Sequence, residues 1–317
     1  MTPTGLPSLV LVLVLASAML HAWWNVLLAR VPRGHDTTAV GLTLGLIAWA
    51  PLALARWRVD DGVWPYVLLS AALELAYFAA LNLAYAKAPA HATYPVARGL
   101  APVLLLPAAV FTGTRVPAWA GLAVAAISAG ILLTTRGTVD RRALGYAVPV
   151  AACIAGYTFV DSRGVGHADP ATYLWLVMIP VTVVMLMTRM VIGRGTAALR
   201  TELRPATFVM GFGVFGAYGL VLTALTMVTI AQVPAVAAVR ETSILFVTAL
   251  SWWAAFRRPE TVPAEPGRPR RSRPDPDGRT RRGTGLQRRG DTRHHLTQHG
   301  PCPLHPSVHD PDHLRWP

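Results

Sequence analysis

Two arginines lie deep inside long apolar stretches of the sequence, where an isolated charge is costly. Arg98 and Arg240 each stand several residues from the ends of their stretch. A planar guanidinium pairs well with carboxylate or phosphate, and ionisable residues at membrane depth usually serve function. The two arginines therefore predict a buried cavity that binds an anionic or zwitterionic ligand. The alternatives are a structural ion pair with an acid such as Glu74 or Asp161, and a side chain that reaches back to the membrane surface.

Three acidic residues, Glu74, Asp161 and Glu241, also lie within apolar stretches. A carboxyl group that is buried near cations can exchange its proton close to neutral pH, as a proton-coupled exchanger requires. We therefore predict that one of these acids carries the coupling proton, and we place Glu74 first because it is furthest from the end of its stretch. The alternative is a permanent ion pair with one of the arginines.

Two pairs of polar residues share a four-residue spacing, which puts both members on one face of a helix. His21 and Asn25 form the first pair, and Tyr157 and Asp161 form the second. They predict hydrogen bonds to a substrate; the alternative is hydrogen bonding between helices, which is common in lipid. No second histidine or cysteine is suitably spaced, so no metal site is expected. The predicted substrate-binding residues are Arg98, Arg240, His21, Asn25, Tyr94, Tyr157 and Asp161.

Prolines and glycines indicate where the helices bend or pack closely. Pro95, Pro102 and Pro234 are predicted hinges beside the cavity, because each removes a backbone donor; tolerated kinks are the alternative. Tyr77 and Tyr218 are further candidates for the cavity lining. Close helix packing is predicted for a later stretch that contains Gly211, Gly213, Gly216 and Gly219.

The elements that must position these residues are membrane-spanning helices. Of the 317 residues, 53% are hydrophobic and 14% are charged, against about 25% charged in soluble domains, and the mean hydropathy is +0.42. Apolar stretches of about 18 or more residues predict spanning helices and are too long for barrel strands. We predict an all-α integral membrane protein in which nine helices of a ten-helix plan are visible, at 7–29, 38–56, 64–86, 90–111, 116–135, 143–162, 171–191, 206–230 and 234–255.

The polar residues recur in the same order in the two parts of the chain. Arg98 follows Asn25 by 73 residues, and Arg240 follows Asp161 by 79. This spacing predicts a first five-helix repeat at residues 1–137 and a second at 138–256, whose last helix is missing. Because five is odd, the two repeats would enter the membrane from opposite sides, which is a recurring transporter plan with the substrate site between the repeats.

Three short motifs, taken in their order and spacing, resemble the EamA branch of the drug/metabolite transporter superfamily. They are Leu20-His21-Ala22-Trp23-Trp24-Asn25, Tyr94-Pro95-Val96-Ala97-Arg98-Gly99 and Arg240-Glu241-Thr242-Ser243. The resemblance covers residues 7 to about 255. It implies ten helices in two inverted halves and the movement of small metabolites, often outward. The sequence departs from the pattern after Trp253, where the tenth helix is expected.

Residues 257–317 differ in composition from the rest of the chain. They hold 13 arginines and 7 acidic residues, and with so few aliphatic residues we predict a disordered basic tail. An out-of-frame reading of GC-rich coding sequence has the same composition; a natural tail that contacts anionic lipid is the alternative. The chain's net charge of +13 is thus shared by the tail and the loops, and nucleic acid is not an expected partner.

The sequence contains no phosphate-binding glycine loop and no H-E-x-x-H or G-x-S-x-G motif. We therefore expect no enzymatic activity, no cofactor and no ATP-driven step. The predicted function is a multi-pass secondary transporter of the cell (inner or plasma) membrane that exports small polar, anionic or zwitterionic metabolites, with membrane lipid and protons as its other partners. The alternative is a truncated, inactive or structural membrane protein that lacks its last helix.

Overall fold

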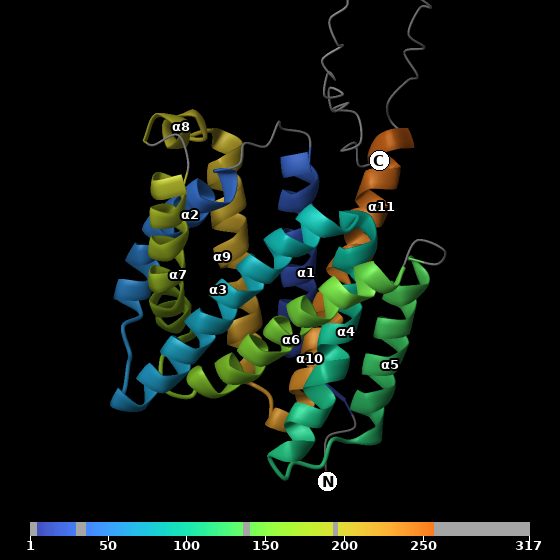
Figure 1. Ribbon diagram of the computed structural model, residues 1–317. Coiled ribbons are helices and arrows are strands. Elements are labelled where there is room, and N and C mark those ends of the chain that lie inside the picture. Colours follow the sequence, from blue (N-terminus) through green and yellow to red (C-terminus); the bar gives the residue numbers. More distant parts are fainter. Residues whose placement is uncertain (1–4, 30–35, 136–139, 193–195, 257–317) are drawn as a thin grey trace, which may run out of the picture. The chain divides into compact units, whose positions relative to one another are not determined.

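The computed structural model describes residues 5–29, 36–135, 140–192 and 196–256, which form one helical unit (Figure 1). The predicted disordered tail at 257–317 lies outside these residues. Within them, the regular elements are helices, apart from one isolated β-bridge. The helices are α1 Ser8–Ala29, α2 Thr37–Ala55, α3 Trp64–Lys87, α4 Ala90–Phe111, α5 Ala118–Leu133, α6 Arg141–Gly164, α7 Pro170–Ile192, α8 Thr196–Thr201, α9 Pro205–Leu225, α10 Val233–Glu241 and α11 Ser243–Phe256, with short 3-10 turns at Asp61–Val63 and Ile230–Gln232.

Eight segments of the described chain are long and apolar enough to cross a membrane. They correspond to eight of the nine predicted spans, so the prediction of an all-α, multi-pass membrane protein is confirmed. The remaining span, predicted at 116–135, is the shorter helix α5 of 16 residues. At 1.5 Å per residue α5 is about 24 Å long, which is less than the roughly 30 Å hydrocarbon core of a bilayer.

The ninth predicted span is not one continuous helix. Helix α10 ends at Glu241 and α11 begins at Ser243. Between them the Thr242 hydroxyl donates to the carbonyl oxygen of Val239 at 2.6 Å, a local bond of the kind that competes with regular helix geometry. The interruption therefore falls directly after the Arg240-Glu241 pair.

The prolines predicted as hinges occupy different helix positions. Pro95 and Pro102 lie inside α4, where each leaves a carbonyl without its helical donor. Pro234 lies in the first turn of α10, where a proline costs no hydrogen bond. In this span the helix is interrupted eight residues later, at Thr242.

Glycines bring α2 and α9 into close contact. A Cβ atom on Gly211 would overlap the carbonyl oxygen of Gly41, and one on Gly45 would lie 2.7 Å from the carbonyl oxygen of Gly211. On the same helix, a Cβ on Gly213 would lie 2.6 Å from the ring of Trp24 on α1. The predicted role of the α9 glycines in close packing is confirmed, and α9 packs against both α1 and α2.

Two loops at one end of the helices are joined to each other. Val59 and Ala168 form an antiparallel β-bridge, and the amide of Asp60 donates to the carbonyl of His167 at 2.9 Å. The side chains of Asp60 and His167 also meet at 2.9 Å. The loop before α3 is thereby fixed to the loop before α7.

Candidate functional site

The candidate site is built around α10, which is buried among its neighbours. Every residue of α10 except Val239 is buried, because α1, α4, α5, α6 and α9 all contact this helix. Seven of its nine residues are apolar, and the two charged ones, Arg240 and Glu241, come last. A cation at this position is favoured by the negative end of the helix dipole.

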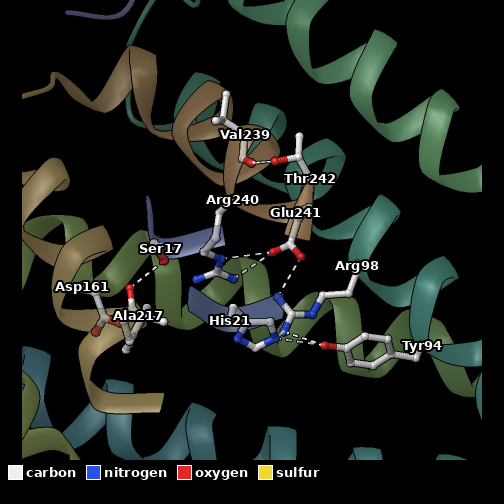
Figure 2. Close-up of polar contacts among 11 residues, drawn as sticks. Ser17, His21, Tyr94, Arg98, Asp161, Ala217, Val239, Arg240, Glu241 and Thr242 are labelled. Atoms are coloured by element: carbon white, nitrogen blue, oxygen red, sulfur yellow. Dashed lines mark hydrogen bonds and ion pairs between the residues drawn. The ribbon is translucent and has the colours of Figure 1, made fainter. Parts of the chain in front are cut away.

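Glu241 bridges the two arginines that the sequence singles out (Figure 2). Its Oε2 accepts a hydrogen bond from Nη1 of Arg98 at 2.7 Å. Its Oε1 accepts from Nε and Nη2 of Arg240 at 3.1 and 3.0 Å. Glu241 is 0% exposed and each arginine 7%. The three residues form a buried arginine–glutamate–arginine cluster, hereafter the ion-pair cluster, which joins α4 to α10.

His21 and Tyr94 complete the surroundings of Arg98 (Figure 2). Nη2 of Arg98 donates to the Tyr94 hydroxyl at 2.8 Å and lies 3.3 Å from Nε2 of His21. Tyr94 is one helical turn before Arg98 on α4, while His21 comes from α1. The guanidinium also lies 5.1 Å from the centre of the Tyr94 ring, within the range of a cation–π contact.

Two aromatic rings face Arg240. Its guanidinium lies 6.0 Å from the ring centre of Tyr157 on α6 and 5.7 Å from that of Tyr218 on α9. The two tyrosines contact each other edge-on, and Tyr77 on α3 contacts Tyr157 in the same manner. Arg240 therefore lies against an aromatic wall formed by three helices.

Asp161 is connected to this wall through hydrogen bonds. It is 0% exposed and accepts from the Tyr173 hydroxyl at 2.8 Å. It also accepts from the hydroxyl of Tyr218, the residue whose ring faces Arg240. Asp161 thus contacts the ion-pair cluster indirectly, through Tyr218, and does not form the direct arginine pair that the sequence allowed.

Glu74 on α3 lies apart from these hydrogen bonds. It is 5% exposed, yet neither carboxylate oxygen has a hydrogen bond or ion pair to a residue that the structure describes. A buried carboxylate without such partners is costly when charged. The arrangement is suited to a group that gains and loses a proton.

The ion-pair cluster carries an excess of positive charge and of hydrogen-bond donors. Arginine stays protonated in proteins, so the two guanidinium groups outnumber the one carboxylate that they contact. The buried Nε of Arg98 donates to no described residue, and Nη1 of Arg240 has no hydrogen bond within the described chain. Unused donors beside an unbalanced positive charge favour an anionic ligand.

Five of the seven predicted substrate-binding residues come together, Asp161 reaches the cluster only through Tyr218, and Asn25 lies apart. His21, Tyr94, Arg98, Tyr157 and Arg240 line the cluster or contact it directly. The amide of Asn25 instead donates to the His21 carbonyl within its own helix, at 2.8 Å. Its predicted substrate contact remains a prediction.

Tyr173 is a hydrogen-bond partner of Asp161 that was not among the residues predicted from the sequence. It lies on α7 and donates to Asp161 on α6, twelve residues earlier. Its four-residue neighbour within α7 is the apolar Val177, so spacing within that helix gave no signal. Its position in the first turn after a short α6–α7 loop was the available clue, because neighbouring helices joined by such a loop lie side by side.

Comparisons with known proteins identify no relative. A scan against models of protein families found no match, and a search of curated protein sequences found no similar sequence. The arguments for function therefore rest on the residues and geometry of this chain.

Proposed function

We propose that this protein is a secondary transporter of small anionic or zwitterionic metabolites and that the ion-pair cluster binds the substrate's negative group. The observation that carries the proposal is the buried pair of arginines that shares a single glutamate. A substrate carboxylate or phosphate would supply the missing negative charge and accept from the unused donors. The tyrosines around the arginines would contact the rest of the substrate.

The pattern of helix contacts supports an inverted-repeat arrangement. Helix α1 packs against α9, and α6 packs against α3. In the same way α1 packs against α10 and α11, and α6 packs against α4. The contacts of α1 and the contacts of α6 are equivalent if α1 corresponds to α6, α3 to α9, and α4 to the α10–α11 segment. In the same order, α2 corresponds to α7. In transporters of this kind the substrate binds between the repeats, and the ion-pair cluster joins helices of both.

The interruption at Thr242 gives further support. The break is local, because Thr242 keeps a right-handed helical backbone conformation. Breaks in spanning helices are common beside transporter sites. Here the interruption directly follows Arg240 and Glu241. Movement at this point would change the distance between the two guanidinium groups.

Proton coupling forms the second part of the proposal. Glu74 is the preferred carrier because its buried carboxylate lacks partners among the described residues. Asp161 is hydrogen-bonded to two tyrosines, and Glu241 bonds to both arginines. Both acids are thus already bonded to described side chains, whereas the carboxylate of Glu74 is not.

The test is uptake of a metabolite panel by purified protein in proteoliposomes, with and without a pH gradient. Carboxylates, amino acids and phosphate esters are compared with neutral amides or alcohols of the same size. The proposal predicts uptake of at least one charged class, stimulation by the gradient, and little uptake of its neutral analogue. Equal uptake of charged and neutral analogues, or no uptake above empty liposomes, contradicts it.

A further inference from the structure

A recess that is lined by no residue of the ion-pair cluster lies at one end of the helices. It has a volume of about 570 Å³ and is open on one side. Its walls come from α1, α2, α7 and α9, and none of the residues of the ion-pair cluster lines it. Leu20, Trp49, Leu52 and Leu220 give its inner part an apolar character. We call this recess the α9 groove.

The floor of the groove follows α9. Gly216, Gly219, Thr223 and Thr226 line it in succession, and the side chains of Leu20 on α1 and Trp49 on α2 pack against the two glycines. The ten helical steps from Gly216 to Thr226 correspond to about 15 Å along a helix. That is about half of the 30 Å hydrocarbon core, or the depth of a single lipid leaflet.

Two unpaired cations stand at the mouth of the groove. Arg56 and Arg58 are both exposed and line it, and neither side chain forms an ion pair with a described residue. Asp169 lies beside them, but its carboxylate accepts from the amide of Ala171 at 3.0 Å at the start of α7. The mouth therefore offers two guanidinium groups to an anion.

Interfacial aromatics place this mouth at the level of the lipid headgroups. Trp57 lies between the two arginines and Trp64 begins α3; they are 53% and 48% exposed. Exposed tryptophans at the ends of spanning helices are typical of the membrane–water interface. The apolar groove thus lies at the level of a lipid's acyl chain, the tryptophans lie at the interface, and the arginines lie at the level of the headgroup phosphate.

We propose that the α9 groove binds an anionic phospholipid. One acyl chain lies along α9 between α1 and α2, and the headgroup phosphate is held by Arg56 and Arg58. Such a lipid would fill a space that otherwise separates two helices packed on α9, and so would fix their spacing. The proposal does not depend on the proposed transport function, because no residue of the ion-pair cluster contributes to this groove.

The experiment is a titration of the detergent-purified protein with phosphatidylglycerol and with phosphatidylcholine, followed by native mass spectrometry. The wild-type protein is expected to bind one phosphatidylglycerol more tightly than phosphatidylcholine. The Arg56→Gln/Arg58→Gln double variant should lose this preference, with about a fivefold drop in affinity for each arginine. The matched control, Arg141→Gln/Arg142→Gln, makes the same charge change at the start of α6 and should retain tight binding.

A second variant tests the apolar part of the groove. Thr223→Phe fills the floor without changing the charge and should weaken binding of both lipids; its elution as a single species shows that it is folded. Glycerol phosphate, which has the headgroup charge but no chains, should not compete with the bound lipid. The proposal is overturned if Arg56→Gln/Arg58→Gln binds phosphatidylglycerol like the wild type, or if glycerol phosphate displaces the lipid.

Discussion

Nη1 of Arg98 lies 2.7 Å from Oε2 of Glu241, although the two residues are 143 positions apart in the chain. The contact joins α4 to the end of α10, next to the interruption at Thr242. The other oxygen of the same carboxylate is bonded to Arg240. A single buried acid therefore keeps two guanidinium groups close together, and the consequences of removing each partner differ.

Glu241→Gln is expected to destabilise the protein more than Arg98→Gln. Without Glu241 two buried guanidinium groups lose their counter-charge, and removing one partner of a buried pair costs about 3–5 kcal/mol. Without Arg98 the carboxylate keeps both hydrogen bonds from Arg240. Thermal unfolding in detergent should give the lower Tm for Glu241→Gln. Adding Arg98→Gln to Glu241→Gln should recover part of the loss; equal Tm values for the two single variants would refute this account.

Glu74→Gln is expected to make transport insensitive to an imposed pH gradient. The amide keeps the shape of the side chain but cannot release a proton, and the wild-type carboxylate has no hydrogen bond to a described residue. The measurement is substrate uptake at several pH gradients. Glu202→Gln is the control, because Glu202 is also buried but accepts from Thr37 at the start of α2. A gradient response that persists in Glu74→Gln would assign the proton to another acid.

Joining the two bridged loops by a disulfide is expected to stop transport reversibly. Val59 and Ala168 form a β-bridge, and bridged residues lie about 4.5–5.5 Å apart at Cα, within disulfide range. Val59→Cys/Ala168→Cys is made in a background in which Cys153 and Cys302 are serine. In the proposed alternating access, opening at this end separates these loops, so oxidation should abolish uptake and a reductant should restore it. Each single-cysteine variant should be unaffected, and full uptake by the oxidised double variant would argue against opening at this end.

Gly211→Ala is expected to lower stability by about 1–3 kcal/mol, the usual cost of overpacking. The added methyl group would overlap the backbone of Gly41 and force α2 away from α9. Gly121→Ala on α5 is the matched control, because a Cβ there meets no atom within 4 Å. Alanine favours a helix over glycine by about 1 kcal/mol, so the control should be neutral or slightly stabilised. Equal Tm values for the two variants would contradict the proposed close packing.

The sequence was sufficient to predict the spanning helices and to identify many of the buried charged residues. Long apolar stretches specify spanning helices because lipid leaves the backbone no other partners. The same cost of burying charge singled out Arg98, Arg240 and Glu241 before any contact was known.

The partners of these residues could not be derived in the same way. The sequence allowed the arginines to pair with Glu74, Asp161 or Glu241, and the packing of α10 against α4 selects Glu241. The interruption at Thr242 was also missed, because apolar composition continues on both sides of it. The pairing with Glu241 and the interruption at Thr242 both arise from contacts between helices. The hydropathy of the sequence carries no information about such contacts.

The most direct test of the central claim is substrate uptake by Arg98→Ala in proteoliposomes, measured beside the wild type. The variant should insert and elute normally, since Glu241 remains bonded to Arg240. Arg98→Lys, which keeps the charge but not the planar fork, should recover only part of the activity. We expect Arg98→Ala to abolish uptake while leaving the amount of protein in the membrane unchanged. Wild-type uptake by this variant would contradict the proposal that the ion-pair cluster binds the substrate.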